Sequence, residues 1–364
     1  MLLSEILSYL GSLVPFALQE NYDNSGLIIG SPQAEITKAL VCVDVTEEVI
    51  DECLALNGNL IISHHPMVFT GLKRFTGSNL TERLVTRCIR EDIAVMAMHT
   101  NLDNYMQGVN RILCDKIGIR NARILRPVEG LLRKLVTFCP QLQAEALRTA
   151  LFSAGAGQIG NYDSCSFNTA GQGTFRALPG ANPFVGEIEK LHQESEERIE
   201  VIFPAFLEKP VLAALLSVHP YEEVAYDIYT LSNSYPQAGA GMIGELETPV
   251  ESREFLQHVK KTLSVGCIRH TLLPAGKISK IAVCGGSGSF LIRDALTAGA
   301  DAFLTGDIKY HDFFIPENRL LLADIGHYES EQYTKELIYT LLKKKFPTFA
   351  LQISRTITNP VNYL

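Results

Sequence analysis

Two adjacent histidines, His64 and His65, stand where an apolar run of the sequence ends. Residues 59–62 are typical of a buried strand, and Pro66 cannot continue a sheet, so both imidazoles are predicted to lie at a strand end. Strand ends are where α/β proteins place their reactive groups. Neighbouring strand residues point to opposite faces, so this pair can serve one metal centre only if the chain turns here or if two metals bind.

Three further predicted strands also end in residues of metal-ligand type. These residues are His99 and Asp103, Asp307 and His311, and His327 and Glu331. The carboxyl ends of parallel strands meet at one edge of a sheet, so the groups are predicted to share one cleft. His327 and Glu331 would lie on the same face if one helical turn holds both.

The donors in these clusters are imidazoles and carboxylates, without a thiolate. This set suits zinc, manganese, iron or cobalt rather than a structural zinc site held by cysteines. A bridging carboxylate would hold two ions about 3.5–4 Å apart, an arrangement that activates water for hydrolysis. A lone histidine at a strand end is more often a hydrogen-bonded surface or capping residue, but the concurrence of several such pairs favours a metal site.

Two polar turns carry weaker signals. Residues 285–289 are rich in glycine and lie between a predicted strand and a helix, where free amides would cradle a phosphate. They fit neither the dinucleotide nor the Walker pattern, so a tight turn is the favoured interpretation. Asp23-Asn24-Ser25-Gly26 also has the composition of an ordinary turn, and that interpretation is favoured for it as well.

Size and composition limit the classes of function. The chain has 364 residues, 46% hydrophobic and 20% charged, enough for two or three domains. Its net charge of −8 gives no general attraction to nucleic acid or anionic lipid. No apolar run approaches the roughly 20 residues of a membrane span, and the N-terminus lacks the basic start of a signal peptide. The eight cysteines form no Cys-x-x-Cys pair, which predicts reduced thiols and a cytoplasmic protein.

The elements that position the clusters are predicted from the alternation of apolar runs and helical patterns. Residues 39–62 are typical of β-α-β, which predicts a largely parallel sheet. His64 lies 22 positions after Cys42, and Gly306 lies 22 positions after Cys284, which favours an internal duplication. The predicted fold is therefore a duplicated α/β domain with a central, largely parallel sheet, over residues 1–130 and 234–364. A β-α-β-β-α-β, ferredoxin-like α+β domain is inserted at 131–233.

Five motifs, in order, resemble the NIF-three-like proteins, often named GTP cyclohydrolase 1 type 2 homologues. The motifs are Asp23-Asn24-Ser25-Gly26-Leu27, Ser63-His64-His65-Pro66, His99-Thr100-Asn101-Leu102-Asp103, Thr305-Gly306-Asp307 and Gly326-His327-Tyr328-Glu329-Ser330-Glu331. The resemblance implies a dinuclear metal centre, with zinc as the first choice and iron, manganese or cobalt as alternatives. The implied ligands are His64, His65, Asp103, His327 and Glu331. His311 is left outside this set, as a candidate group near the ligands or the substrate.

The inserted segment, with His219-Pro220-Tyr221-Glu222-Glu223 before its last strand, looks like the long form of the family. In that form the insert is similar to the CutA and PII proteins, which are ferredoxin-like and trimeric. The resemblance thus implies a ring-shaped homohexamer, built as a trimer of dimers or a dimer of trimers. For His219 itself a structural role in a turn is favoured over a metal role.

Three functions are considered. The first is a metal-dependent hydrolase of a nucleotide or similar phosphorylated heterocycle; in its GTP cyclohydrolase form, activated water attacks C8 of the purine and His99 or His311 moves protons. The second is a non-enzymatic, metal-handling or regulatory assembly whose insert binds an effector or partner. The third, a phosphodiesterase or nuclease, is weakened by the acidic charge. The sequence contains no recognisable guanine pocket, so the substrate rests on the resemblance.

Overall fold

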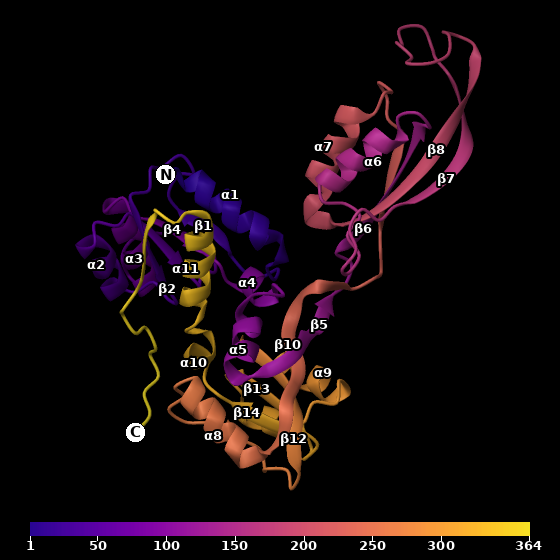
Figure 1. Cartoon of the computed structure of the whole chain (residues 1–364). Helices are drawn as coiled ribbons and strands as arrows, with labels where there is room; N and C mark the ends of the chain where they lie inside the picture. Colours follow the sequence, from indigo (N-terminus) through magenta and orange to yellow (C-terminus); the bar gives the residue numbers. More distant parts are fainter. The chain divides into compact units, whose positions relative to one another are not determined.

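The computed structural model describes residues 1–364 and divides them into two compact units (Figure 1). Unit 1 comprises Met1–Arg126 and Gln237–Leu364, and unit 2 comprises Pro127–Pro236. Unit 2 therefore interrupts the sequence of unit 1. None of the helices combines the length and apolar character that crossing a bilayer would require.

The first sheet of unit 1 has five strands in the order β1-β4-β3-β2-β15. The strands are β1 (Gly26–Ile29), β2 (Lys38–Cys42), β3 (Leu60–Ser63), β4 (Ala94–Ala97) and β15 (Ala350–Ile353). All are parallel except β1, which pairs with β4 in the antiparallel sense at the edge. β3 and β4 are buried along their whole length, as their unbroken apolar sequences predict for central parallel strands.

Six helices and a 3-10 turn accompany this sheet. They are α1 (Leu3–Leu13), η1 (Phe16–Leu18), α2 (Glu47–Ala55), α3 (Leu80–Arg90), α4 (Thr100–Asn104), α5 (Val109–Ile117) and α11 (Thr334–Lys345). The Thr46 hydroxyl accepts a hydrogen bond from the Val49 amide and caps α2, while Asn79 caps α3. Two apolar clusters form the core of this half, one with α1 and α11 and one with α2 and α3. Both central strands are therefore held rigidly up to their carboxyl ends.

The second sheet of unit 1 has the order β11-β14-β13-β12-β10-β5. The strands are β5 (Ile119–Val128), β10 (Tyr235–Glu251), β11 (Arg269–His270), β12 (Lys277–Ser287), β13 (Ala302–Gly306) and β14 (Leu321–Asp324). β12, β13 and β14 are parallel, while β10 is antiparallel to β12 and β11 is antiparallel to β14. The remaining elements are α8 (Ser252–Thr262), η3 (Ser289–Leu291), α9 (Ile292–Thr297), η4 (Tyr310–Phe314) and α10 (His327–Glu331).

The two sheets of unit 1 share a strand order. In each, a short antiparallel edge strand is followed by three parallel strands, β1-β4-β3-β2 in one sheet and β11-β14-β13-β12 in the other. The strand ends that carry the predicted ligands thus belong to two separate sheets. A single sheet edge does not collect them.

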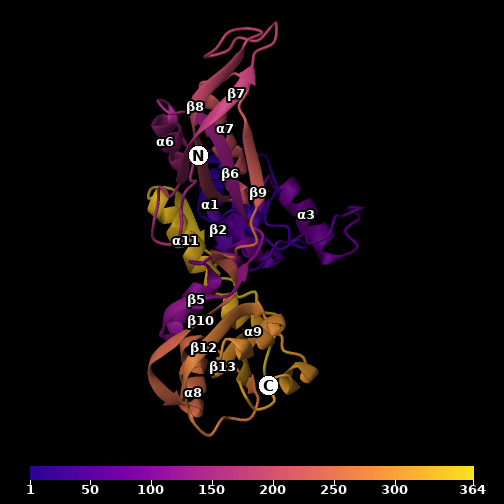
Figure 2. The same cartoon turned by 90° about the vertical axis from the view of Figure 1, so that its right-hand side faces the viewer.

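Unit 2 is an antiparallel sheet, β7-β8-β6-β9, with two helices. Its elements are β6 (Leu132–Pro140), α6 (Ala144–Ser153), β7 (Phe167–Arg176), β8 (Leu191–Pro204), η2 (Ala205–Leu207), α7 (Glu208–Val218) and β9 (Tyr226–Thr230). This is the split β-α-β order. Figure 2 shows the β7–β8 hairpin extending beyond the helices. His219 is buried, with Nε2 2.9 Å from the Phe138 carbonyl and Nδ1 accepting from the Tyr221 amide, which agrees with the favoured structural role.

Candidate metal centre

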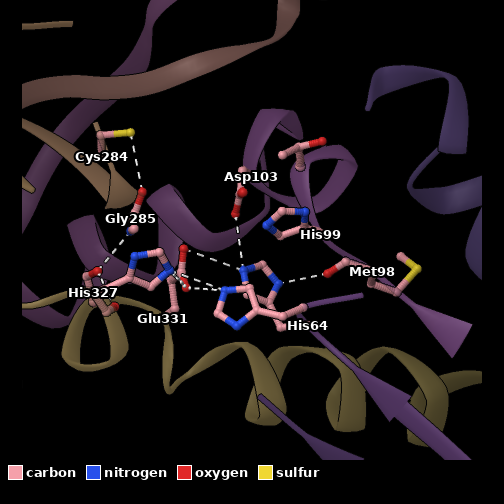
Figure 3. A network of polar contacts seen from close by, with 12 residues as sticks. His64, Met98, His99, Asp103, Cys284, Gly285, His327 and Glu331 are labelled. Carbon is pink, nitrogen blue, oxygen red and sulfur yellow. Dashed lines mark hydrogen bonds and ion pairs between the residues drawn. The ribbon is translucent and has the colours of Figure 1, made fainter. Parts of the chain in front are cut away.

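The side chains predicted as metal ligands lie together in unit 1 (Figure 3). His64 and His65 follow β3, Asp103 lies on α4 after β4, and His327 and Glu331 lie on α10 after β14. The chain leaves the strand after Ser63, and the rings of His64 and His65 lie 4.9 Å apart between centroids. Strand ends from the two sheets therefore converge on a single cluster.

Glu331 lies at the middle of this cluster. Its Oε1 atom is 3.6 Å from Nε2 of His64, which is also 3.6 Å from Oδ1 of Asp103. Its Oε2 atom is 2.9 Å from Nε2 of His65 and 3.0 Å from Nε2 of His327. The two carboxylate oxygens thus face two sets of donors, and each set has the spacing of a group that could hold a metal ion.

Each histidine of the cluster has its Nδ1 atom hydrogen-bonded to an acceptor oxygen. The acceptors are the Met98 carbonyl for His64 at 2.8 Å, and, each at 2.7 Å, Asp44 for His65, Asp23 for His99 and Asp307 for His327. Because carbonyl and carboxylate oxygens only accept, Nδ1 carries a proton, which leaves Nε2 as the atom that can offer a lone pair to a metal. Such anchoring of the far nitrogen is typical of metal-binding histidines.

Several buried polar atoms of the cluster have no hydrogen-bond partner. They are Nε2 of His64, Oδ1 of Asp103 and Oε2 of Glu331. Buried polar atoms are nearly always satisfied, because an unsatisfied one costs about 1–3 kcal/mol. Here the orphaned atoms are all lone-pair donors that point at one another, so the residues fit a bound cation. Imidazole nitrogen with carboxylate oxygen suits a divalent ion such as zinc.

The surroundings shift the pKa values of the cluster strongly. Burial, reinforced by the charge of Glu331, raises the pKa of Asp103 to about 8. Burial also works against the ionised form of Glu331, but the neighbouring histidines outweigh it and hold its pKa well below the usual range. The hydrogen bond to Asp44 and the nearby carboxylate of Glu331 outweigh burial and raise the pKa of His65 to about 10, and Glu331 and Asp307 raise that of His327 to about 9. Without a metal, the cluster therefore retains protons.

Asp23 was interpreted from the sequence as part of an ordinary turn, and the structure gives it a further role. Its Oδ1 atom accepts from His99, and its Oδ2 atom accepts from the Ser25 hydroxyl at 2.8 Å and the Thr100 amide at 3.0 Å. These bonds outweigh burial and hold the pKa of Asp23 well below its usual range. The signal for this role in the sequence was the motif's place among the five family motifs.

Asp44 and Asp307 both orient histidines, but the sequence pointed to only one of them. Asp307 was singled out after β13, and it contacts His327 through Nδ1. Asp44 is not among the residues predicted from the sequence, although a carboxylate just after the carboxyl end of β2 is the same kind of signal. His311 does not join the cluster: it is exposed on η4, where its ring contacts Tyr310 and Phe314. Of the two proton-transfer candidates, His99 alone lies with the cluster.

The glycine-rich stretch 285–289 begins within β12, which ends at Ser287, and three of its amides are not free to bind a phosphate. The amides of Gly285, Gly286 and Gly288 donate to side chains, at 2.8, 2.9 and 2.8 Å, respectively. Gly286 has φ of +61°, and a Cβ atom there would lie 2.2 Å from Oε1 of Glu331. The prediction of a tight turn over 285–289 is therefore wrong for its first three residues, which belong to β12, and Gly286 makes room there for the Glu331 carboxylate.

Three cavities border the cluster, all lined by His65 and His327, and the smallest and the largest of them differ in their walls. One, of about 250 Å³, also contains the aromatic side chains of Tyr22, Phe69 and Phe290. The other, of about 590 Å³, has walls from β14, α10 and the C-terminal segment. The cluster can therefore be reached by small molecules.

The fold and the cluster define a class of protein: a two-sheet α/β scaffold whose facing strand ends hold histidines and carboxylates suited to a metal. Within that class, the chain belongs to the Duf34/NIF3 (NGG1p interacting factor 3) family, whose model matches residues 1–360. The family resemblance drawn from the five motifs is thereby confirmed.

Individual relatives match over nearly the whole chain. The protein named GTP cyclohydrolase 1 type 2 homolog of Bacillus subtilis is 37% identical, over 99% of this chain and 98% of its own. A crystal structure of a Bacillus cereus protein related to NIF3 is similar, with a TM-score of 0.86, 36% identity, and coverage of 99% of this chain and 98% of its own. HcgD from Methanocaldococcus jannaschii, at 17% identity and a TM-score of 0.59 over 98% of each chain, shares the fold.

Proposed function

We propose that this protein is a hydrolase with a dinuclear metal centre. One divalent ion would be held by His64, Asp103 and Glu331, and the other by His65, His327 and Glu331. Zinc is the first choice for both, with iron, manganese or cobalt as alternatives. The observation that carries the proposal is the carboxylate of Glu331, whose Oε1 and Oε2 atoms each face a separate set of buried donors.

Bound divalent ions would polarise a substrate and activate water for attack near neutral pH. The chain's own contribution is orientation, because the Nδ1 anchors fix each imidazole. His99 supports a role in proton transfer, because its ring lies 5.3 Å from those of both His64 and His65, between centroids, and Asp23 fixes its tautomer. We assign His99 that role and withdraw His311 as a candidate.

The substrate proposed is a nucleotide or a similar phosphorylated heterocycle. The name of the Bacillus subtilis relative suggests GTP. Tyr22, Phe69 and Phe290 line the smallest cavity and are all more than half exposed, so each offers a ring face on which a planar base could stack. Attack at C8 of a purine remains the concrete form of the reaction.

A second candidate function is a metal-handling or regulatory assembly in which unit 2 binds an effector. It is favoured by a cavity of about 770 Å³ within unit 2, lined in part by Phe175, Phe184 and Tyr221. The volume is that of a small-molecule site. This function would be distinguished from that of a hydrolase by a ligand that binds tightly to unit 2 without being consumed.

Several proposals about architecture accompany these functions. We assign residues 1–130 and 234–364 to a duplicated domain, supported by the shared strand order of the two sheets, and 131–233 to a CutA- and PII-like insert, supported by its split β-α-β order. The long form of the family further suggests a homohexameric ring. A cytoplasmic location is supported by six buried, free cysteines, whose thiols would stay reduced there.

The test of the hydrolase is elemental analysis followed by a nucleotide screen. Wild-type protein should contain two divalent ions per chain and convert a nucleotide, and His64→Ala should lose at least one ion and the turnover. His311→Ala is the matched control, because it removes an exposed histidine outside the cluster, and it should keep both. A wild-type protein that takes up no divalent metal would exclude the dinuclear centre; one that binds metals but converts no nucleotide would favour the regulatory assembly.

A further inference from the structure

The last residues of the chain, 354–364, form an extended segment that we call the C-terminal strap (Figure 1). It begins where β15 ends, in the first sheet of unit 1. There the Glu52 carboxylate on α2 accepts hydrogen bonds from the Ser354 hydroxyl at 2.6 Å, the Arg355 amide at 2.9 Å and the Thr356 hydroxyl at 2.9 Å. The strap is thus tied to the first sheet before it reaches the cluster.

Farther along, the strap contacts residues that neighbour the proposed metal ligands. The Thr358 hydroxyl donates to Oδ2 of Asp44 at 2.6 Å. The side-chain amide of Asn359 donates a hydrogen bond to Oε1 of Glu329 at 3.2 Å. The strap therefore joins the carboxyl end of β2 to α10, the two places from which His65 and His327 are oriented.

Asp44 connects the strap to the cluster. Its Oδ1 atom accepts from Nδ1 of His65 at 2.7 Å, and its Oδ2 atom accepts from Thr358. One third of the Asp44 side chain is exposed, so burial alone does not fix the carboxylate. The hydroxyl of Thr358 supplies the second contact that sets its plane.

The same arrangement recurs at another histidine of the cluster. Asp23 accepts from His99 with one oxygen and from the Thr100 hydroxyl with the other. In both cases a carboxylate lies between an imidazole and a threonine. Thr100 lies next to His99 in sequence, whereas Thr358 comes from the far end of the chain.

We propose that Thr358 is a positioning residue of the metal centre. By holding Asp44, it keeps Nδ1 of His65 as the hydrogen-bond donor and keeps the Nε2 lone pair aimed at the position shared with His327 and Glu331. The inference rests on the proposed dinuclear centre. It adds that the C-terminal strap completes one of the two metal positions and leaves the other, at His64 and Asp103, untouched.

The test compares three strap variants in the metal-depleted, full-length protein, titrated with zinc by calorimetry. Thr358→Val keeps the shape and removes the hydroxyl, Thr358→Ser retains it, and Thr356→Val removes a strap hydroxyl that bonds Glu52 away from the cluster. Loss of groups that orient metal ligands weakens binding about 10–100-fold. Thr358→Val should weaken one of two binding events about 10-fold, with Thr358→Ser and Thr356→Val close to wild type.

Two further measurements separate positioning from general loosening of the strap. Absorption spectra with cobalt should change for Thr358→Val and be restored in Thr358→Ser, since the bands report ligand geometry. Asp44→Asn should weaken the same zinc-binding event. The double variant Asp44→Asn/Thr358→Val should bind zinc no more weakly than Asp44→Asn, because both residues act on His65 along one path. If Thr358→Val folds poorly, Thr358→Ala, which also removes the hydroxyl, takes its place in the cycle.

The outcomes distinguish this inference from the proposed function. Equal effects of Thr358→Val and Thr356→Val, or additive effects with Asp44→Asn, overturn the positioning role while leaving the dinuclear centre in place. Wild-type protein that binds no zinc overturns both.

Discussion

The Nε2 atoms of His65 and His327 lie 3.3 Å apart, although 262 positions of sequence separate the two residues. Both rings donate their Nδ1 protons to carboxylates, so in the neutral form of both rings the Nε2 atoms would meet lone pair to lone pair. Oε2 of Glu331, at 2.9 and 3.0 Å from them, adds a third negative centre. Three such atoms repel one another unless protons or a cation lie among them, and this contact predicts that the position takes up a metal.

Glu331→Gln is predicted to empty both metal positions. The amide keeps the size of the side chain but loses the charge that both donor sets share, so affinity should fall at least about 100-fold at each. Metal content after dialysis measures the effect. Glu336→Gln, a change at an exposed residue paired with Lys116, is the control and should retain the wild-type content. Two ions retained by Glu331→Gln would contradict a bridging role.

Asp23→Asn is predicted to destabilise the protein by about 2 kcal/mol at neutral pH, because charge-assisted hydrogen bonds to His99 and Thr100 are lost. Urea unfolding measures the free energy. The pKa of Asp23 is depressed in the folded state, so its contribution is present above the unfolded value near 4 and is lost below it. The difference in the free energy of unfolding between wild type and variant should therefore become smaller in acid. Asp51→Asn, at an exposed ion pair with Arg87, should cost no more than about 0.5 kcal/mol.

The proposed ligands could be singled out from the sequence because their signals are local. An apolar run that ends in His64 and His65 before Pro66 marks a strand end. Glu331 follows His327 by four positions, a spacing that suits one helical turn. The partners of the histidines were harder to predict. His99 bonds Asp23 across 76 positions and His65 bonds Asp44 across 21, and no local pattern pairs a carboxylate with a distant imidazole.

His311 shows that the sequence also could not predict the direction in which the chain continues after a strand. Asp307 and His311 both follow β13, and periodicity does not say where the chain turns after a strand. Asp307 has φ of +55°, so the backbone changes direction there and η4 leaves His311 exposed. In the same way, strand patterns predicted a parallel sheet but did not show that the clusters face each other from two sheets.

The metal-free protein is predicted to lose stability as the pH rises from about 6.5 to 9. The pKa values of His65 and His327 are raised to about 10 and about 9, so the folded state holds protons that the unfolded chain releases near 6.5. Their stabilisation is complete below pH 6.5 and is lost as the pH rises through the folded values. Asp103, with its pKa raised to about 8, acts in the same direction. Thermal unfolding of chelator-treated protein across this range measures the effect.

Zinc provides the control for this pH dependence, since a bound cation replaces the protons. With zinc in excess, the fall in unfolding temperature should diminish or reverse, and binding at pH 7.5 should release at least about one proton. Calorimetry in buffers of different ionisation enthalpy counts the protons. An unfolding temperature of the metal-free protein that rises between pH 6.5 and 9 would refute the prediction that the cluster holds protons in the absence of metal.

Gly286→Ala is predicted to lower metal content beyond its effect on stability. The new Cβ atom would meet Oε1 of Glu331 at 2.2 Å, and the residue would keep a left-handed φ of +61°. Gly118→Ala is a matched control, because its φ is +87° and nothing lies within 4 Å of the added atom. Both variants should lose about 1 kcal/mol from backbone strain. Of the two, Gly286→Ala alone should displace the carboxylate and release metal; equal metal contents would show that the centre tolerates a shifted Glu331.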